Sequence, residues 1–174
     1  VPSIASVSKL TLITKTKDAD VATRVEFRGG QLRNVTKTSG KTGTTVRVER
    51  LFSNVPARKK FLKSNRVEFK HILNYLHYQS IVHPKISFKF ISNNKEKLNY
   101  PIAKDVEHRL KAVFGSNFFK RDLIRIDVDK TRIKLKGYVG GLEEEPEGFS
   151  TYRYLFVNGR FIKDKVIYHS IKAA

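Results

Sequence analysis

The segment from Gly43 to Lys63, GTTVRVERLFSNVPARKKFLK, constrains the fold more than any other part of the sequence. Its first half alternates β-branched or apolar residues with polar ones, which predicts a strand. Ser53 and Asn54 are residues that can cap a helix, and Pro56 suits the first turn of a helix. We therefore expect a strand that leads directly into a helix.

The expected helix concentrates positive charge on its outer side. Its basic residues are Arg58, Lys59, Lys60 and Lys63. Phe61 and Leu62 lie among them and are expected to make the inner side of the helix apolar. A solvated helix face is the simpler explanation for any one of these cations. The alternative, a binding surface, needs support from the rest of the chain.

The composition favours a folded protein that binds a polyanion. The 174 residues carry a net charge of +19 at a pI of about 10.2, and 40% of them are hydrophobic. A folded chain this basic indicates nucleic acid first and an anionic membrane surface second. No apolar run is long enough to span a bilayer, so we expect no membrane segment. The absence of cysteine excludes disulfides, thiolate metal sites and a cysteine nucleophile, and it fits a reducing compartment.

Periodicity and turn signals predict an α+β chain whose strands are mostly antiparallel. The expected strands are Lys9–Thr16, Thr23–Arg28, Gln31–Lys37, Lys85–Ser92, Lys97–Tyr100, Leu123–Val128, Arg132–Val139 and Tyr152–Val157. The expected helices are the end of one at Val1–Ser8, then Asn65–Ile81, Asp105–Phe114 and Asp164–Lys172. The expected tight turns are Gly29-Gly30, Asn93-Asn94, Asp129-Lys130-Thr131 and Asn158-Gly159. The helix at Asn65–Ile81 should bury one face, formed by Phe69, Ile72, Leu73, Leu76 and Ser80.

Pro101 is the expected boundary between two domains, residues 1–100 and 101–174. Most of the excess positive charge lies before it. Gly140–Gly148 contains four glutamates, and we expect a solvated loop there, with a divalent cation site as the alternative.

No part of the sequence predicts a self-contained enzyme. A nucleophile with an adjacent base, paired acids in a structured cleft and a complete nucleotide motif are all absent. Gly40–Thr44 could form a glycine-rich phosphate cradle, but the Walker spacing is missing. A second basic cluster, formed by Arg160, Lys163 and Lys165, lies at another junction between a turn and a helix. Both clusters are typical of surfaces that bind the phosphate backbone without reading bases.

Three segments in the same order resemble the MutL family of DNA mismatch repair proteins. Gly43–Lys63 resembles the family's Gly-Thr strand that continues into LF-x-N-x-PAR-x-KFL. Ser3–Ser8, SIASVS, resembles the segment that directly follows the family's third ATP-binding motif. Phe156–Arg160 with Lys163-Asp164-Lys165 resembles its FVNGR-x-(V/I)-(R/K)-D segment. Together these matches extend over almost the whole chain.

The resemblance implies the fold and the function of a longer parent. The chain would be the C-terminal part of a GHKL-type ATPase α/β sandwich, followed by the N-terminal part of a ribosomal-protein-S-five-like α+β domain. The parent would bind ATP and Mg²⁺, dimerise with a second MutL-type subunit and bind DNA in a basic groove. With a mismatch-recognition protein of the MutS type, it would couple mismatch recognition to strand incision and removal. Its location would be cytoplasmic at a bacterial nucleoid, or nuclear in a eukaryote.

The resemblance also implies roles for individual residues. Gly43 and Thr44 would belong to the fourth ATP-binding motif, near the nucleotide base. Lys60, Lys63 and Lys165 stand where relatives place basic side chains towards the DNA groove, whereas Tyr78 replaces a residue that is basic in some relatives. The catalytic Glu and the magnesium-binding Asn would lie upstream of this segment, and a phosphate-contacting Lys downstream. The chain alone is therefore expected neither to hydrolyse ATP nor to bind nucleotide well.

Two alternatives remain open from the sequence. A stand-alone basic α+β module that binds nucleic acid, such as a ribosome-associated protein, would fit the charge and the fold class. Another GHKL relative, such as a topoisomerase subunit or a chaperone, would share the Gly-Thr strand. Neither alternative accounts for the PAR-x-KFL and FVNGR segments.

Overall fold

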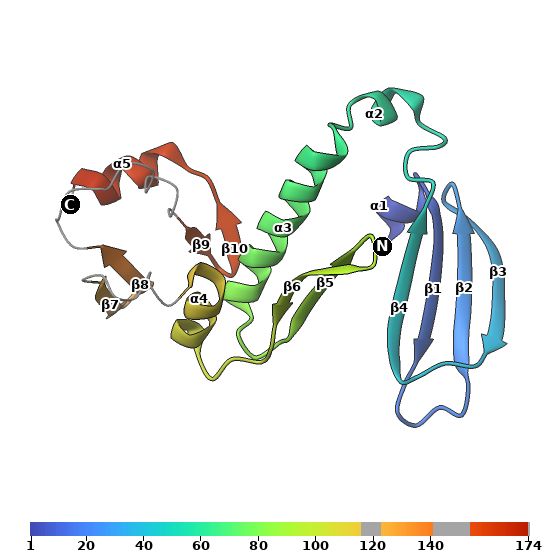
Figure 1. Cartoon of the computed structure of the whole chain (residues 1–174), viewed down its shortest axis with the longest axis horizontal. Helices are drawn as coiled ribbons and strands as arrows, with labels where there is room; N and C mark the ends of the chain where they lie inside the picture. The colour runs from blue at the N-terminus through green and yellow to red at the C-terminus, as the bar shows by residue number, and fades with distance from the viewer. Residues whose placement is uncertain (116–122, 141–153, 174) are drawn as a thin grey trace. The chain divides into compact units, whose positions relative to one another are not determined.

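The computed structural model describes residues 1–115, 123–140 and 154–173 (Figure 1). The chain divides into two compact units, Val1–Glu68 and Phe69–Ala174. Within the described ranges, the strand pairs are all antiparallel, which confirms the predicted mixed, mostly antiparallel architecture. The expected domain boundary at Pro101 lies inside the second unit and stays a prediction.

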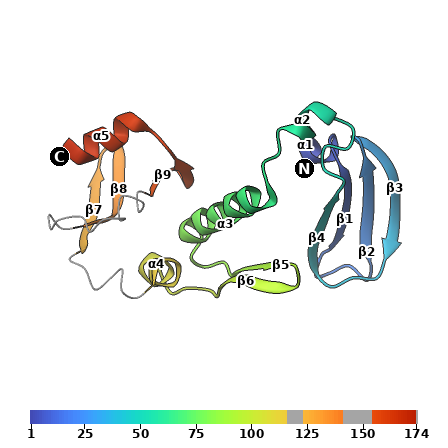
Figure 2. The same cartoon turned by 45° about the horizontal axis from the view of Figure 1, so that its top comes forward.

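The first unit is built on a four-stranded sheet, whose strands lie side by side in Figure 1 and Figure 2. The strand order is β3-β2-β1-β4, with β1 at Lys9–Lys15, β2 at Ala22–Arg28, β3 at Gln31–Thr38 and β4 at Gly43–Glu49. The short helix α1, Pro2–Ala5, precedes the sheet, and the helix α2, Pro56–Lys60, follows it. The four strands predicted here are thus confirmed. The strand does not lead directly into the helix, however, because residues 50–55 form a loop between β4 and α2.

Register places the apolar residues of the first unit on one face of the sheet. Leu10 lies opposite Phe27 on one side and Val48 on the other. Leu10 is fully buried, whereas Val48 is exposed because β4 is an edge strand. Between β2 and β3, Gly29 and Gly30 have φ angles of 58° and 85°. These values are those of the two-residue hairpin turn that the sequence predicts.

The second unit contains helices and three two-stranded sheets. Its hairpins are β5–β6 (Phe88–Ser92 and Lys95–Tyr100), β7–β8 (Leu123–Lys130 and Ile133–Gly140) and β9–β10 (Leu155–Val157 and Arg160–Ile162). Its helices are α3 (Asn65–Val82), which begins in the first unit, α4 (Val106–Phe114) and α5 (Lys165–Ala173).

Most predicted elements of the second unit are confirmed, with several differences. The strand expected at Lys85–Ser92 begins only at Phe88, and the one expected at Lys97–Tyr100 begins already at Lys95. The strand β10 was not predicted, because its three residues are too short to show a period. The β7–β8 turn lies at Thr131 and Arg132, so both expected strand bounds shift by a residue or more. Residues 141–148 of the expected acidic loop and residues 152–153 of the expected last strand lie outside the described residues.

The predicted buried face of α3 is only partly correct. Ser80 and the neighbouring Ile81 are buried, but Ile72 is 47% exposed. The described contacts of this helix are partly aromatic: the Phe69 ring lies 5.7 Å from the Phe90 ring, and Tyr78 stacks on Phe161. Burial therefore depends on where β5 and β10 reach the helix, which helical periodicity alone does not reveal.

A buried arginine holds together the part of the second unit around Pro101. Arg109 of α4 is fully buried. Its Nη2 donates hydrogen bonds to three backbone carbonyl oxygens, those of Pro84 (3.0 Å), Ile86 (2.8 Å) and Pro101 (2.8 Å). Its guanidinium carbon also lies 5.9 Å and 5.5 Å from the ring centroids of Phe88 and Tyr100. This one side chain therefore ties α4 to the β5–β6 hairpin.

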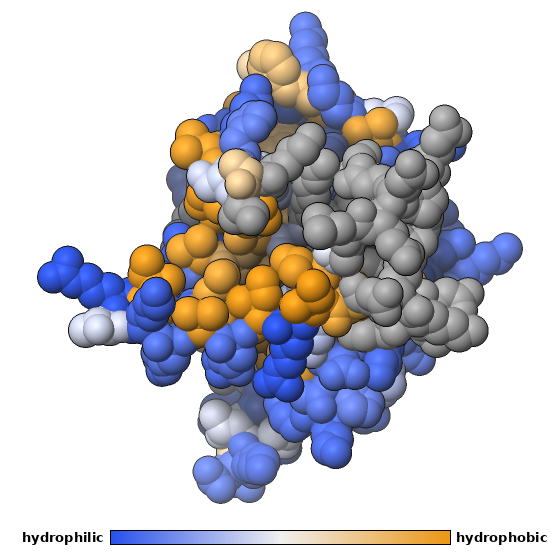
Figure 3. All heavy atoms as spheres, turned by 90° about the vertical axis from the view of Figure 1, so that its left-hand side faces the viewer, coloured by the Kyte–Doolittle hydropathy of each residue, from blue (hydrophilic) through white to orange (hydrophobic). Residues whose placement is uncertain are grey.

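Apolar side chains remain exposed on the second unit. Figure 3 views the side of the molecule on which α5 and β7 lie, and it shows an apolar patch bordered by hydrophilic side chains. Val166 of α5 is 73% exposed, and Ile133 of β8 is 70% exposed. These elements thus keep apolar surface that no described residue covers.

The N-terminus of α4 is capped by a side chain. Asp105 is the cap, and its carboxylate accepts a hydrogen bond of 2.9 Å from the backbone N–H of His108. The same carboxylate contacts His108 Nδ1 at 2.7 Å. At the other end, Gly115 ends the helix with a φ of 85°.

Because this cap is a carboxylate, we predict that its contribution to the stability of α4 depends on pH. The hydrogen bonds from the His108 backbone and ring lower the pKa of Asp105 below its ordinary value of 3.8. Because the carboxyl pKa is lower in the folded state, the cap stabilises α4 above that ordinary value and loses its contribution as the pH falls through the lowered one. An NMR titration of the Asp105 carboxyl, with hydrogen exchange at the His108 amide, measures this. Asp105→Asn, which keeps an acceptor but does not titrate, should remove the part of the pH dependence that comes from this cap; a carboxyl pKa at or above 3.8 would contradict the prediction.

Candidate functional site

The first basic cluster lies on α2 and in the loop that follows it. We call Arg58, Lys59, Lys60 and Lys63 the α2 cluster. All four side chains are exposed, and among the described residues none of them forms a salt bridge. Three of these cations lie in the last turn of α2, where they also interact favourably with the helix dipole. The cluster is therefore a set of free cations on one short element.

The expected apolar inner side of this helix is wrong. The helix α2 has five residues and buries none of them, and Phe61, which follows it, is 79% exposed. The expected capping is wrong as well, because Val55 is the N-cap and no side chain caps the helix. Asn54 instead donates its side-chain amide to the carbonyl oxygen of Ser6 at 2.9 Å. A helix this short cannot form a separate inner face, so its position depends on hydrogen bonds to other segments.

The second basic cluster lies where β10 leads into α5. We call Arg160, Lys163 and Lys165 the β10–α5 cluster. These side chains are also exposed and free of salt bridges among the described residues. Lys163 Nζ lies 6.0 Å from the centroid of the Phe161 ring. Asp164 caps α5, since its carboxylate accepts a hydrogen bond of 2.9 Å from the Ile167 backbone N–H.

An aromatic stack supports the β10–α5 cluster. The rings of Tyr78 and Phe161 are nearly parallel, at 11°, with centroids 3.7 Å apart. Phe161 also contacts Tyr154 and Phe156, at centroid distances of 6.2 Å and 5.8 Å. Burial raises the pKa of Tyr78. Tyr78 therefore has a packing role against the hairpin that carries Arg160.

The two expected nucleotide-binding residues lie at the start of the edge strand β4. Gly43 has a φ of 126° and no atom within 4 Å of where a Cβ would be, so the space beside it is open. Thr44 Oγ1 lies 2.9 Å from Thr14 Oγ1 on the paired strand β1. At the far end of the same pair, the hydrogen bond and charge of Lys9 lower the pKa of Glu49. Gly43 and Thr44 thus form an open edge that leaves room for a ligand.

Gly40 has a packing role that argues against the phosphate cradle. A Cβ at Gly40 would lie 2.9 Å from the Cβ of Ala22, which is fully buried. Close packing therefore accounts for this glycine without a bound phosphate.

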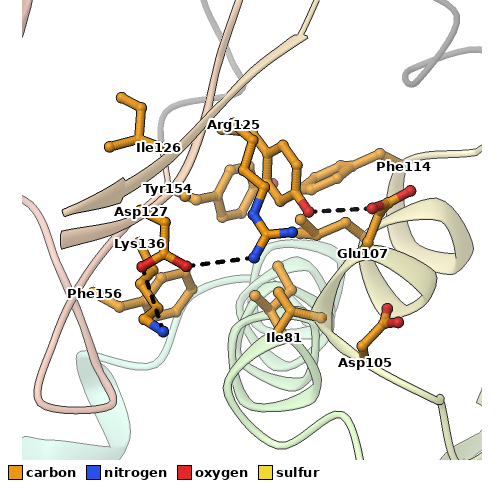
Figure 4. Close-up of a pocket in the computed structure, with 14 residues that line it drawn as sticks. Ile81, Asp105, Glu107, Phe114, Arg125, Ile126, Asp127, Lys136, Tyr154 and Phe156 are labelled. Atoms are coloured by element: carbon orange, nitrogen blue, oxygen red, sulfur yellow. Dashed lines mark hydrogen bonds and ion pairs between the residues drawn. The ribbon is translucent and has the colours of Figure 1, made fainter. Parts of the chain in front are cut away.

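A cavity of about 600 Å³ lies in the second unit, between α4 and the β7–β8 hairpin (Figure 4). Its apolar walls include Ile81, Phe114 and Phe156. Charged side chains of the cavity are paired: Asp127 contacts both Arg125 and Lys136 at 3.4 Å. Glu107 accepts hydrogen bonds from Lys111 (2.8 Å) and Tyr138 (3.3 Å), and the hydrogen bond from Lys111 lowers its pKa. The cavity contains neither basic cluster.

Metal and membrane sites are not found in the described part of the chain. Over residues 1–115, 123–140 and 154–173, no three His, Asp or Glu side chains come together in a way that could hold a metal ion. Within the same residues, no helix is both long and apolar enough to cross a membrane.

Comparison with known proteins identifies the family. The family model described as "DNA mismatch repair protein, C-terminal domain" matches residues 110–174. The DNA mismatch repair protein MutL of Neisseria meningitidis serogroup C is 37% identical over 172 residues, which cover 99% of this chain and 26% of the relative. The chain belongs to the MutL family of DNA mismatch repair proteins. The MutL of Chloroherpeton thalassium is 35% identical over 172 residues, which again cover 99% of this chain and 26% of the relative.

The solved structures agree on the fold. The Aquifex aeolicus MutL ATPase domain complexed with ADP has a TM-score of 0.78 to this chain, with 24% identity. The match covers 98% of this chain and 65% of that one. The mixed α+β fold thus resembles the MutL ATPase domain, as predicted for a GHKL-type protein. The MutL-family chain spans only about a quarter of the length of its curated relatives.

Proposed function

We propose that this MutL-family chain carries part of the DNA-binding surface of an ATP-dependent mismatch repair protein. The observation that carries the proposal is the pair of free cationic clusters on the two family segments, PAR-x-KFL and FVNGR. Exposed Lys and Arg without internal partners can neutralise phosphates and release counterions, which gives binding that is independent of sequence and sensitive to salt. Each cluster is proposed to contribute its own phosphate contacts to the basic DNA-binding groove of the parent.

The nucleotide site of the parent is proposed to include Gly43 and Thr44. The open space beside Gly43 and the ADP complex of the Aquifex aeolicus neighbour support this assignment. Bound ATP with Mg²⁺ would supply the hydrolysable phosphates, while the described residues would border only one side of the nucleotide. The two domains are proposed to be residues 1–100 and 101–174, and the start of the family match at residue 110 supports this division.

The partners are proposed from the family. The parent would pair with a second MutL-type subunit, receive a mismatch signal from a MutS-type protein and lead to strand incision and removal. The bacterial source of the relatives supports a cytoplasmic location at the nucleoid over a nuclear one. The ribosome-associated alternative has no observation in its favour beyond charge and fold class.

The proposal predicts DNA binding that weakens steeply with salt. The full-length protein should bind a short duplex of mixed sequence, and its logarithmic affinity should fall linearly with the logarithm of salt concentration. Lys60→Glu, Lys63→Glu and Lys165→Glu should each weaken binding and reduce the magnitude of the salt slope by about 1. Fluorescence anisotropy with a labelled duplex, between about 50 and 200 mM salt, measures both quantities.

A matched control separates local contact from net charge. Lys97 lies on β6, is exposed and belongs to neither cluster. Lys97→Glu changes the net charge by the same amount and should leave the salt slope unchanged. Binding that ignores salt, or that responds equally to Lys97→Glu and Lys60→Glu, would refute the assignment of the clusters to DNA.

A further inference from the structure

The turn between α1 and β1 is a hydrogen-bonding centre of the first unit. We call Ala5–Ser8 the α1–β1 turn. Its four consecutive carbonyl oxygens each accept a hydrogen bond from a distant segment: Ala5 from Gly30 N–H (2.8 Å), Ser6 from Asn54 Nδ2 (2.9 Å), Val7 from Phe52 N–H (2.7 Å) and Ser8 from Gly29 N–H (3.0 Å). Ala5, Val7 and Ser8 are buried, so the turn is a fixed point of the unit.

Two of the four donors belong to the loop that joins β4 to α2. We call residues 50–55 the β4–α2 loop. Phe52 is held through its backbone N–H, and Asn54 through its side chain. The other two donors come from the turn between β2 and β3. Asn54 is therefore the one side-chain donor of the four, and a substitution can remove it without changing the backbone.

The hydrogen bonds continue from this loop into α2. The Val55 backbone N–H donates to the Phe52 carbonyl oxygen at 3.1 Å. The Val55 carbonyl oxygen accepts in turn from the Lys59 N–H, also at 3.1 Å. Since α2 buries none of its residues, these hydrogen bonds fix its position in place of core packing. The α2 cluster is thereby connected to the α1–β1 turn.

The backbone of the β4–α2 loop needs such support. Arg50 and Phe52 have φ angles of 54° and 60°, in the left-handed region. That region is unfavourable for residues other than glycine, and such residues persist only where the surrounding structure holds them. The bond from Phe52 to Val7 and the bond from Asn54 to Ser6 lie on either side of Ser53 and restrain the loop at these positions.

We propose that Asn54 is a positioning residue for phosphate binding by the α2 cluster. Its side-chain amide anchors the start of α2 to the α1–β1 turn, so that the four cations face one stretch of DNA backbone together. The proposal rests on the function proposed above and adds a neutral residue that touches no DNA. Its ligand class is the phosphate backbone of duplex DNA.

The test is the salt dependence of DNA binding by Asn54→Ala in the full-length protein. Net charge does not change, but a free loop should stop some cations of the α2 cluster from binding phosphates at the same time. We expect affinity at low salt to fall about five- to tenfold, as for the loss of one well-made hydrogen bond. We also expect the magnitude of the salt slope to fall by about 0.9 for each phosphate that the cluster no longer neutralises.

Two controls keep the test specific. Asn34 is an exposed asparagine on β3, and Asn34→Ala should leave affinity and slope unchanged. A double-mutant cycle tests the coupling of Asn54 to Lys60. The variant that combines Asn54→Ala with Lys60→Ala should lose DNA affinity by a smaller factor than the product of the two single-variant factors, because Lys60 acts through the same anchored element. Should Asn54→Ala lower the folded fraction, Asn54→Asp against Asn34→Asp repeats the comparison with a side chain of equal size that cannot donate.

The outcomes distinguish the two proposals. If Lys60→Glu weakens binding but Asn54→Ala leaves the salt slope unchanged, the positioning role of Asn54 is wrong and the DNA assignment stands. If Asn54→Ala lowers the affinity but leaves the salt slope unchanged, the positioning role is also wrong, since such a loss reports only a smaller folded fraction. If neither salt nor Lys60→Glu affects binding, the proposed function itself fails, and the role of Asn54 fails with it.

Discussion

Arg109→Met should lower the free energy of unfolding of the second unit by about 2–3 kcal/mol. The substitution fills a similar volume but removes the Nη2 donor from three backbone carbonyl oxygens. The Pro84 oxygen keeps a hydrogen bond of 2.8 Å from the Ala103 N–H, whereas those of Ile86 and Pro101 lose their Arg109 donor. A hydrogen bond from a charged donor contributes about 1.5–3 kcal/mol, and two carbonyl oxygens lose theirs. Part of this loss is offset, because Met also removes the Nε and Nη1 atoms of Arg109, which are buried without a hydrogen-bond partner among the described residues. Urea denaturation followed by far-UV circular dichroism measures the change.

Arg125→Met is the matched control for this prediction. The Arg125 side chain is 70% exposed and contacts Asp127 at 3.4 Å. An exposed ion pair contributes at most about 1 kcal/mol, so this variant should unfold almost as the unmodified chain does. Equal effects of the two substitutions would show that the buried hydrogen bonds of Arg109 do not stabilise the fold.

The position of Arg109 also bears on the proposed domain boundary. The side chain belongs to α4, which follows Pro101, and two of its three acceptors precede Pro101 in the chain. If Pro101 does separate two domains, their junction is braced by a buried cation and cannot act as a free linker. Hydrogen exchange near Ile86 should therefore rise in Arg109→Met before it rises in β9–β10.

Phe161→Ala should destabilise the second unit by about 2–3 kcal/mol. This is below the value of about 3–5 kcal/mol for fully buried phenylalanine, because Phe161 is only half-buried. The loss includes the stack on Tyr78 at 3.7 Å and the contact with Phe156 at 5.8 Å. Aromatic pairs of this kind contribute about 0.5–1.5 kcal/mol beyond their buried area. Thermal unfolding, followed by near-UV circular dichroism of the tyrosines, reports the effect.

Phe61→Ala is the control, since it removes the same atoms from a side chain that is 79% exposed. It should change stability by no more than about 0.5 kcal/mol. Phe161→Ala should also weaken DNA binding, because Arg160 and Lys163 lie on either side of it. Full retention of stability in Phe161→Ala would mean that the aromatic stack does not hold the hairpin.

The sequence alone determined the local architecture of this chain. Alternating residues predicted the four strands of the first unit, and Gly29-Gly30 predicted the turn between two of them, because both signals depend on neighbours in the chain. The same holds for the helix at Asn65. The family resemblance also came from the sequence, since it rests on ordered local motifs.

The tertiary structure decided the partners of the polar side chains. Asn54 looked like a helix cap, but it bonds to Ser6, 48 residues away. Arg109 stood three residues after Val106 and four before Val113, on the apolar side of a helix; this spacing was the only signal that it would be buried. What it bonds to depends on three carbonyl groups of other elements, and no local pattern encodes their position.

The α2 cluster shows both contributions in one element. Its residues and their charge were evident from the sequence, and so was the strand that leads to them. Its short helix, its exposed Phe61 and its attachment to the α1–β1 turn were not. Period and capping signals describe how a segment can fold with its own neighbours, whereas the position of an element without a buried face depends on hydrogen bonds that form only when distant segments meet.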